Sequence, residues 1–206
     1  MSARDAVIVS TARTPIGRAY KGAFNALPSP TLAAHAIRAA VERSGVDPAE
    51  IDDVIIGAAL QQGVQVTIAR TAALRAGLPV TVAGMSLDRQ CGSGLMAIAT
   101  AAKQIIVDRM DVCVAGGVES VSMVQTAEMR IGDDPELLAM HRNVYIPMID
   151  TAEVVGQRYA VSREACDLYA LRSQQLTAMF AVTGMISASN RPSACALAVN
   201  CCERSA

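Results

Sequence analysis

The feature that most constrains the fold is the alternation of short apolar runs with longer segments of helical periodicity. Runs of strand length and character occupy residues 6–10, 54–56, 82–87 and 111–115. Helical spacing of apolar residues, or an Ala-rich composition, marks the intervening residues 30–41, 68–75 and 95–107. Strands that alternate with helices are typical of an α/β layer with a largely parallel sheet. The sequence therefore predicts an α/β fold over the first 120 residues.

Local signals predict where these helices begin and end. Pro30 suits the first turn of a helix, because its missing N–H has no partner there in any case. Asp47, followed three residues later by Glu50, resembles a capping box that opens one further turn. Gly77, with Pro79 just beyond it, predicts the end of the helix over 68–75.

The pattern changes after residue 120. Residues 121–150 are rich in Met and irregular, and a capping-box signal at Asp150 to Glu153 predicts a helix to about residue 160. Ser162 is then expected to cap a second helix that continues through the 170s. We therefore predict an α/β core over residues 1–120 and a partial, helical loop (cap) domain over residues 121–175.

The remaining residues, 176–206, have a different composition. They are rich in small residues and show no clean period, and three cysteines (Cys195, Cys201 and Cys202) lie among the last twelve positions. A disordered segment is one interpretation, but such cysteine density is unusual in a solvated tail. An aberrant end, such as a frameshift or a misplaced gene boundary, is the interpretation that we favour.

Composition excludes several classes of function. The formal net charge is −1 without a basic cluster, and aromatic residues make up 3% with no Trp, so a nucleic-acid surface is not expected. No apolar stretch approaches the length of a membrane span. With two His and no CxxC pair, neither a metal site nor a disulfide framework is expected. Because no targeting segment is evident, we expect a cytoplasmic protein.

The segment most suited to chemistry is DRQCGSGL, residues 88–95, between a predicted strand and a predicted helix. A Cys91 thiolate there faces the positive end of the helix macrodipole. Gly92 and Gly94 leave room beside the sulfur, and the N–H of Cys91 is placed to bond an acyl oxygen. We predict that Cys91 is a nucleophile. The alternative is an inert buried cysteine, the role that we assign to Cys113 and Cys166.

A second motif overlaps the first. Residues 92–97 match G-x-G-x-x-A, and Glu119 follows the next strand as a ribose-binding acid does in dinucleotide sites. Such a site requires an apolar strand that runs into the first Gly, whereas polar residues precede Gly92. Ser93 is disfavoured as a hydrolase nucleophile, because G-x-S-x-G would require Gly at position 91.

Four blocks of sequence resemble the thiolase family in the family's order, over residues 5–175. SLDRQCGSGLMAIATAAKQI is similar to the segment around the acyl-accepting cysteine, and VAGGVESVSM to its AGG-x-ES-M block. STARTPIGRAYKGAF resembles the opening motif, and DTAEVVGQRYAVSREACDLYALRSQQ resembles the loop domain. The resemblance implies a layered α/β/α half with a mostly parallel mixed sheet and a helical loop-domain insertion.

It also implies an activity. Cys91 would take an acyl group from an acyl-CoA as a thioester, and a second thiol or a carbanion would remove it, as in fatty acid metabolism. Coenzyme A thioesters would be substrates, with no permanently bound cofactor. Met148 corresponds to a position that lines the acyl pocket, although Pro147-Met148-Ile149 replaces the usual His-Met-Gly. Full-length members are expected to be dimers or tetramers.

The resemblance covers only the N-terminal half of a thiolase. The Asn-Glu-Ala-Phe and Gly-His-Pro blocks and the second catalytic cysteine of the family are not found, and His35 and His141 lie in no corresponding motif. We therefore expect a truncated, poorly active or inactive acyltransferase. The alternatives are a non-catalytic fragment that binds at most a partner protomer and, third, a dinucleotide-binding domain.

Overall fold

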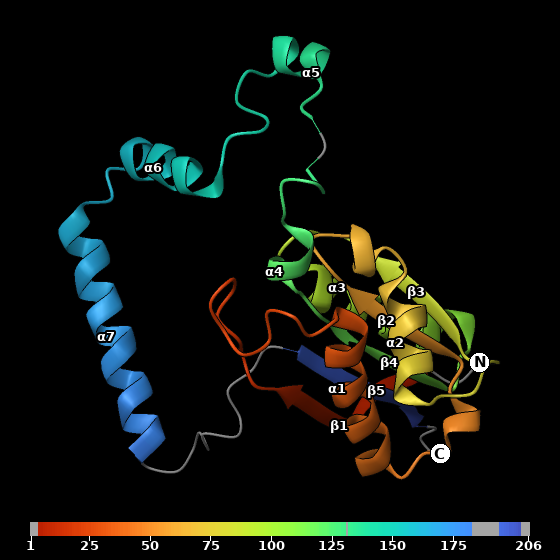
Figure 1. The fold of residues 1–206 in the computed structure, drawn as a ribbon. Coiled ribbons are helices and arrows are strands. Elements are labelled where there is room, and N and C mark those ends of the chain that lie inside the picture. The colour runs from red at the N-terminus through yellow and green to blue at the C-terminus, as the bar shows by residue number, and fades with distance from the viewer. Residues whose placement is uncertain (1–3, 131, 183–193, 203–206) are drawn as a thin grey trace. The chain divides into compact units, whose positions relative to one another are not determined.

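The computed structural model describes residues 4–130, 132–182 and 194–202 (Figure 1). Within it the chain separates into two compact units. The first comprises residues 1–129 together with 189–206, and the second comprises residues 130–188. The α/β part of the chain lies in the first unit, and a purely helical part lies in the second.

The first unit is built on a five-stranded sheet in the order β1-β5-β4-β2-β3. Its strands are β1 (Asp5–Thr14), β2 (Asp53–Gly57), β3 (Ala83–Leu87), β4 (Val112–Gly117) and β5 (Ala194–Cys202). β2 pairs in parallel with β3 and β4, whereas β5 is antiparallel to both of its neighbours, β1 and β4. Only β5 therefore runs against the other strands, and the predicted mostly parallel mixed sheet is confirmed.

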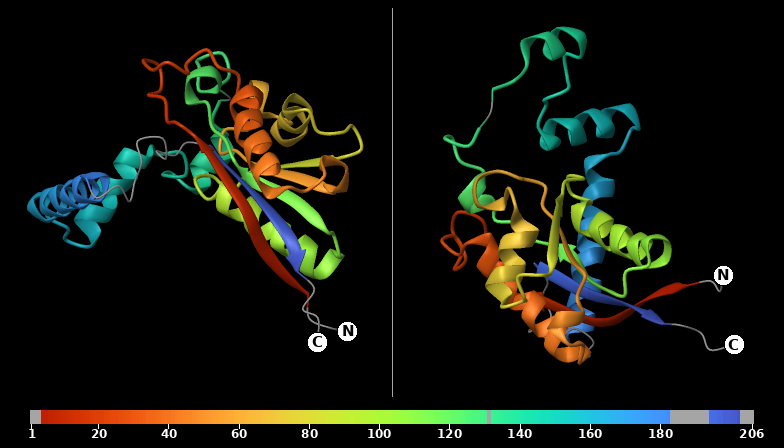
Figure 2. Two further views of the ribbon diagram at one scale, coloured as in Figure 1. Left: turned by 90° about the horizontal axis from the view of Figure 1, so that it is seen from below. Right: turned by 90° about the vertical axis from the view of Figure 1, so that its right-hand side faces the viewer.

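Helices cover both faces of this sheet (Figure 2). α1 (Ser29–Ser44) and α2 (Ile68–Ala76) pack on one face, and α3 (Ser93–Lys103) packs on the other. Alternate residues of β2 divide accordingly: Val54 and Ile56 join the core beneath α1 and α2, and Ile55 joins the core beneath α3. This two-residue alternation is that of a strand buried on both faces. The α/β/α layering is confirmed.

Several predicted helix boundaries are confirmed. Pro30 lies in the first turn of α1, and Gly77 ends α2 in the left-handed conformation with φ 88°. The Asp47 side chain accepts a hydrogen bond of 2.9 Å from the Ala49 amide and so caps a short 3₁₀ turn, η1 (Pro48–Glu50). α3 ends in a π-helical turn, η3 (Gln104–Asp108). A second 3₁₀ turn, η2 (Gly63–Gln65), and a short helix, α4 (Val121–Val124), complete this unit.

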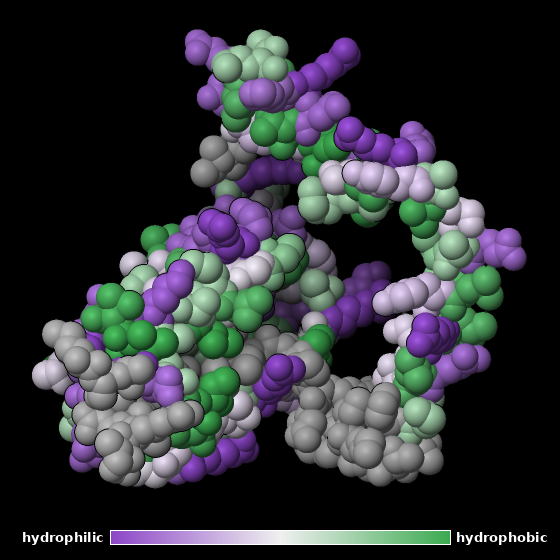
Figure 3. Space-filling view, turned by 180° about the vertical axis from the view of Figure 1, so that it is seen from behind, coloured by the Kyte–Doolittle hydropathy of each residue, from purple (hydrophilic) through white to green (hydrophobic). Residues whose placement is uncertain are grey.

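The second unit contains α5 (Pro135–Met140), α6 (Met148–Arg158) and α7 (Arg163–Val182). Ser162 caps α7 as predicted, because its Oγ accepts a 3.1 Å hydrogen bond from the Ala165 amide. The predicted capping box at Asp150 is wrong: α6 already begins at Met148, and Pro147 takes the N-cap position. Large hydrophobic side chains of α6 and α7 remain exposed, as the hydropathy colours show (Figure 3).

The structure differs from the prediction for residues 176–206. α7 continues to Val182, and residues 194–202 form β5, which pairs on both of its edges. This stretch, ACALAVNCC, contains neither Gly nor Pro, so nothing in it interrupts an extended backbone. Residues 183–193 and 203–206, also assigned to the tail, lie outside the described residues. The division at residues 120 and 175 stays a prediction.

Two negative observations concern the described residues alone. None of their helices combines the length and the hydropathy that a membrane crossing requires. Nor do three or more of their His, Cys, Asp or Glu side chains converge as ligands of a metal ion.

Candidate functional site

The candidate site is built where β2 and β4 end against the start of α3. Gly57 and Gly117, the last residues of these strands, are paired in register. A Cβ on Gly57 would lie 2.3 Å from the carbonyl carbon of Ser93, and a Cβ on Gly117 would lie 3.0 Å from the Cα of Gly94. Glycine at both strand ends thus lets the first turn of α3 lie directly against the sheet.

The turn that leads into α3 is held by hydrogen bonds within it. Gln90 adopts a left-handed conformation with φ 50°, and its amide donates to Asp88 Oδ1 at 2.7 Å. The buried Ser93 hydroxyl accepts a hydrogen bond from the Arg89 amide at 2.8 Å and donates one to the Gln90 carbonyl at 2.6 Å. A non-glycine residue keeps such a conformation only where its surroundings fix it.

The structure places Cys91 on this turn, immediately before Gly92, the N-cap residue of α3. Its side chain is a free thiol and is exposed. The amides of Gly92 and Ser93 already donate to the carbonyls of Arg89 and Gln90, at 3.1 and 3.0 Å. These two amides are therefore committed to the turn, and an acyl oxygen beside Cys91 would need another donor.

Two other cysteines whose side chains the structure describes, Cys113 and Cys166, have different surroundings. Cys113, on β4, is fully buried, and burial, followed by the nearby charges of Asp53 and Asp52, raises the pKa of its thiol to about 12. Such a thiol remains protonated and unreactive. Cys166 is exposed on α7, in the second unit.

Met148 and Cys91 belong to different units of the chain. Met148 is the first residue of α6, in the second unit, and is 71% exposed, whereas Cys91 belongs to the first unit. His35 on α1 and His141 after α5 are both exposed.

Glu119, the candidate ribose-binding acid, is engaged within the chain. Its Oε2 accepts a 2.8 Å hydrogen bond from the Ala59 amide, and its Oε1 accepts one from Gln65 Nε2. Gln65 is fully buried, and its Oε1 accepts hydrogen bonds from the Ser29 hydroxyl at 2.7 Å and the Ser120 amide at 2.8 Å. The carboxylate therefore joins the segments that follow β2 and β4, which weakens the dinucleotide hypothesis. No residue pattern in the sequence predicted this hydrogen-bond network.

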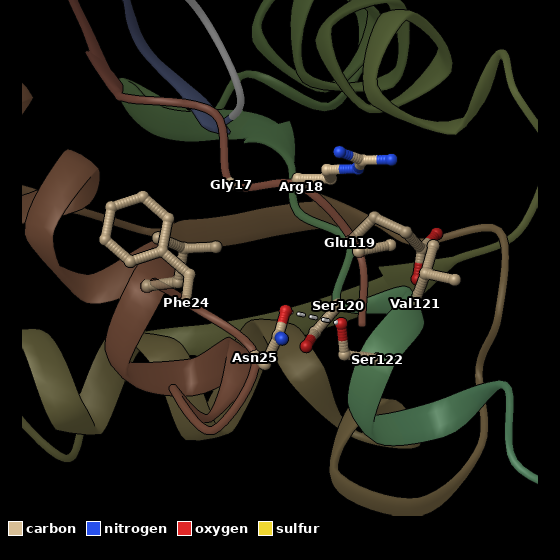
Figure 4. Close-up of a pocket in the computed structure, with 10 residues that line it drawn as sticks. Gly17, Arg18, Phe24, Asn25, Glu119, Ser120, Val121 and Ser122 are labelled. Carbon is tan, nitrogen blue, oxygen red and sulfur yellow. Dashed lines mark hydrogen bonds between the residues drawn. The ribbon is translucent and has the colours of Figure 1, made fainter. Parts of the chain in front are cut away.

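A cavity of about 100 Å³ lies beside this network (Figure 4). Its walls come from the segment between β1 and α1, from α1 itself and from the segment that follows β4. Ser122 Oγ donates to Asn25 Oδ1 at 3.1 Å across one wall, and Phe24 closes another. Cys91 does not line this cavity. A liquid water occupies about 30 Å³, so the cavity has room for a few water molecules.

The sequence and the fold of this chain both match known proteins. Residues 6–187 match the family model described as "Thiolase, N-terminal domain". The chain belongs to the thiolase family. Proteins of this family are acyltransferases that act on coenzyme A thioesters.

Relatives and a solved structure agree with this assignment. The chain is 39% identical over 173 residues to a 3-ketoacyl-CoA thiolase of Bacillus subtilis, covering 84% of this chain and 44% of the relative. It is also 39% identical over 182 residues to an acetyl-CoA acetyltransferase of Cupriavidus necator, covering 82% and 46%. The crystal structure of the Bacillus anthracis acetyl-CoA acetyltransferase matches with TM-score 0.74 and 36% identity, covering 89% of this chain and 49% of that one.

The thiolase chain described here thus spans about half the length of the relatives it matches. The predicted resemblance to the N-terminal half of a thiolase is confirmed.

Proposed function

We propose that this thiolase-family chain carries an acyl-accepting cysteine, Cys91, which takes an acyl group from a coenzyme A thioester. The observation that carries the proposal is the position of Cys91: an exposed thiol on a turn held rigid at the start of α3. Neither Cys113 nor Cys166 occupies such a position. Family membership supplies the class of substrate.

The proposed step is an exchange of thioesters. The Cys91 sulfur attacks the carbonyl carbon of the acyl-CoA, and a bond between that carbon and the sulfur forms. The bond from the same carbon to the coenzyme A sulfur then breaks, and coenzyme A leaves with the electron pair and takes up the proton given up by Cys91. A second thiol, or a carbanion derived from acetyl-CoA, would remove the acyl group in the return step.

We expect this chain on its own to be a slow catalyst. Neither His35 nor His141 lies in a Gly-His-Pro block, the block whose histidine activates the nucleophile in the family that the sequence resembles. Loss of a general acid or base typically costs about 10²- to 10⁴-fold in rate. Met148 as a lining residue of the acyl pocket, and assembly into a dimer or tetramer, belong to the same proposal for a full-length enzyme.

A second candidate is a fragment that binds a partner without catalysis. It is favoured by the large hydrophobic side chains that stay exposed on the helices of the second unit. Those with more than half of their surface exposed include Tyr159, Leu168, Tyr169, Leu171 and Met179. Such side chains are usually covered in a folded assembly.

Intact-mass measurement after incubation with acetyl-CoA separates the two candidates. We expect the parent chain to gain the mass of one acetyl group, the Cys91→Ser variant to gain none, and the Cys166→Ser variant to behave as the parent. Cys166 is the matched control, because it is also an exposed, free thiol. Absence of an adduct on the parent, or an adduct that persists in Cys91→Ser, would contradict the proposed acyl acceptance.

A further inference from the structure

We propose that Ser93 is a positioning residue for Cys91: its buried hydroxyl fixes the turn that presents the sulfur. The inference concerns how the thiol is held and made reactive, and only its relevance to acyl transfer rests on the proposed function. Ser93 does not contact the reacting atoms in this proposal. It acts through the backbone of Arg89 and Gln90, the two residues that precede Cys91.

The first argument is hydrogen bonding. Ser93 Oγ both accepts from the Arg89 amide, at 2.8 Å, and donates to the Gln90 carbonyl, at 2.6 Å. One hydroxyl therefore ties the peptide groups on both sides of the Arg89–Gln90 pair to the first turn of α3. Both bonds are partly buried: Ser93 is 3% exposed, whereas Arg89 and Gln90 are exposed residues. Loss of a buried hydrogen-bonding group leaves its former partners unsatisfied, which costs more than an exposed bond would.

The second argument is backbone strain. Gln90 has φ 50°, a conformation that non-glycine residues adopt at a cost unless they are held there. The Asp88 side chain contributes one bond, to the Gln90 amide, but it does so from the exposed side of the turn. Ser93 holds the opposite, carbonyl end of Gln90 from the buried side. The Ser93 amide donates to the same carbonyl at 3.0 Å, so loss of the hydroxyl removes one of the two bonds that hold the peptide between Gln90 and Cys91.

The third argument is the rigidity of Ser93 itself. A Cβ on Gly57 would lie 2.3 Å from the Ser93 carbonyl and 2.7 Å from its Cβ, so the residue is packed directly against the end of β2. The position of the Ser93 hydroxyl is consequently fixed by the packing of the residue against the sheet. The position of Cys91, which directly precedes the N-cap residue of α3, depends on that packing.

The test is the rate at which iodoacetamide alkylates Cys91, measured by peptide mapping over a series of pH values. Ser93→Ala is expected to slow the alkylation of Cys91 about threefold to tenfold, because one to two hydrogen bonds that order the turn are lost. Ser93→Thr, which keeps a hydroxyl, is expected to retain the parent rate.

Ser29→Ala is the matched control. Ser29, the first residue of α1, is also fully buried, and its hydroxyl donates to Gln65 Oε1 at 2.7 Å. Within the described part of the chain, it makes no hydrogen bond to the turn that carries Cys91. We expect the variant to lower the thermal unfolding midpoint about as much as Ser93→Ala but to leave Cys91 alkylation unchanged. Parent-like alkylation in Ser93→Ala, or an equal loss in Ser29→Ala, overturns the proposal.

Alkylation does not require acyl transfer, so the two proposals fail separately. A parent chain that is not acetylated by acetyl-CoA, but whose alkylation depends on Ser93, contradicts the proposed function and supports the positioning role. A parent chain that is acetylated equally fast with and without the Ser93 hydroxyl contradicts the positioning role and supports the function.

Discussion

The two ends of the parallel strand pair β2 and β4 differ in the side chains that they place between the sheet and α3. At the carboxyl end Gly57 is paired with Gly117, and the first turn of α3 lies against their backbones. At the amino end Asp53 is paired with Cys113, and both side chains are buried. The carboxyl end thus has no side chains between sheet and helix, whereas the amino end encloses two titratable groups.

The difference shows why similar residue types behave differently in this fold. A cysteine enclosed at the amino end is desolvated, which raises the pKa of the Cys113 thiol. Cys91, on the turn just before the residues of α3 that pack against the glycine pair, is exposed. A reagent can therefore reach the thiol near the carboxyl end of the strand pair, whereas the thiol at the amino end is buried and protonated.

The largest expected effect comes from filling the space at the carboxyl end. In Gly57→Ala the new methyl group would overlap the Ser93 carbonyl, which is backbone and cannot move without shifting α3. We expect the free energy of unfolding to fall by about 3 kcal/mol or more, as measured by urea denaturation. The same shift should disturb the turn and slow the alkylation of Cys91.

Gly94→Ala is the control for this prediction. A Cβ there would lie 3.5 Å from the Cα of Gly117, an ordinary van der Waals distance, and alanine favours the helix. We expect the free energy of unfolding to change by less than about 1 kcal/mol. Equal losses in Gly57→Ala and Gly94→Ala would show that close packing of α3 on β2 does not order this end of the sheet.

The second prediction compares the two cysteines directly. In the folded chain at neutral pH we expect iodoacetamide to modify Cys91 at least about a hundredfold faster than Cys113, because the buried thiol has a pKa of about 12. Peptide mapping during the reaction measures both rates. Denaturant serves as the control, since it should bring the two rates close together. Comparable rates in the folded chain would contradict the burial of Cys113.

The features of the strand pair that depend on local residue patterns were predictable from the sequence. The apolar, β-branched run around Ile55 indicates a buried strand, and the glycines around Cys91 indicate a turn into a helix. Gly77 likewise predicted the end of α2, because its left-handed conformation is a local property.

Features that depend on distant contacts were not predictable in this way. The β5 segment shows no clean apolar period, and its place between β1 and β4 is set by pairing with residues far away in the sequence. The network around Gln65 joins segments that follow different strands, and nothing in a lone glutamine marks it as fully buried. The start of α6 was misplaced because Asp150 is a favoured N-cap residue, whereas Pro147, which takes the N-cap position, makes no side-chain cap hydrogen bond that the sequence could signal.

The smallest expected effect concerns the charge at the amino end. Burial, opposed in part by hydrogen bonds from Gln104 and the Val54 amide, raises the pKa of Asp53 above its usual value, and the neighbouring Asp52 raises it further. Asp53 Oδ1 has no hydrogen-bond partner among the described residues, while Gln104 Nε2 donates to Oδ2 at 3.3 Å. The folded state therefore favours the protonated acid, and its contribution to stability is lost as pH rises above about 4.

Asp53→Asn removes this ionisation while keeping an oxygen for Gln104. We expect the variant to be more stable than the parent by about 1 kcal/mol at neutral pH and to lose that advantage in acid, as measured by urea denaturation at several pH values. Asp52→Asn is the opposite control: Asp52 Oδ2 accepts hydrogen bonds from the Asp111 and Val112 amides at 2.7 and 3.2 Å, so neutralising it should destabilise the chain. If both variants changed stability in the same direction, the amino end of the strand pair would not be limited by the burial of Asp53, and the contrast with its glycine-lined carboxyl end would need another cause.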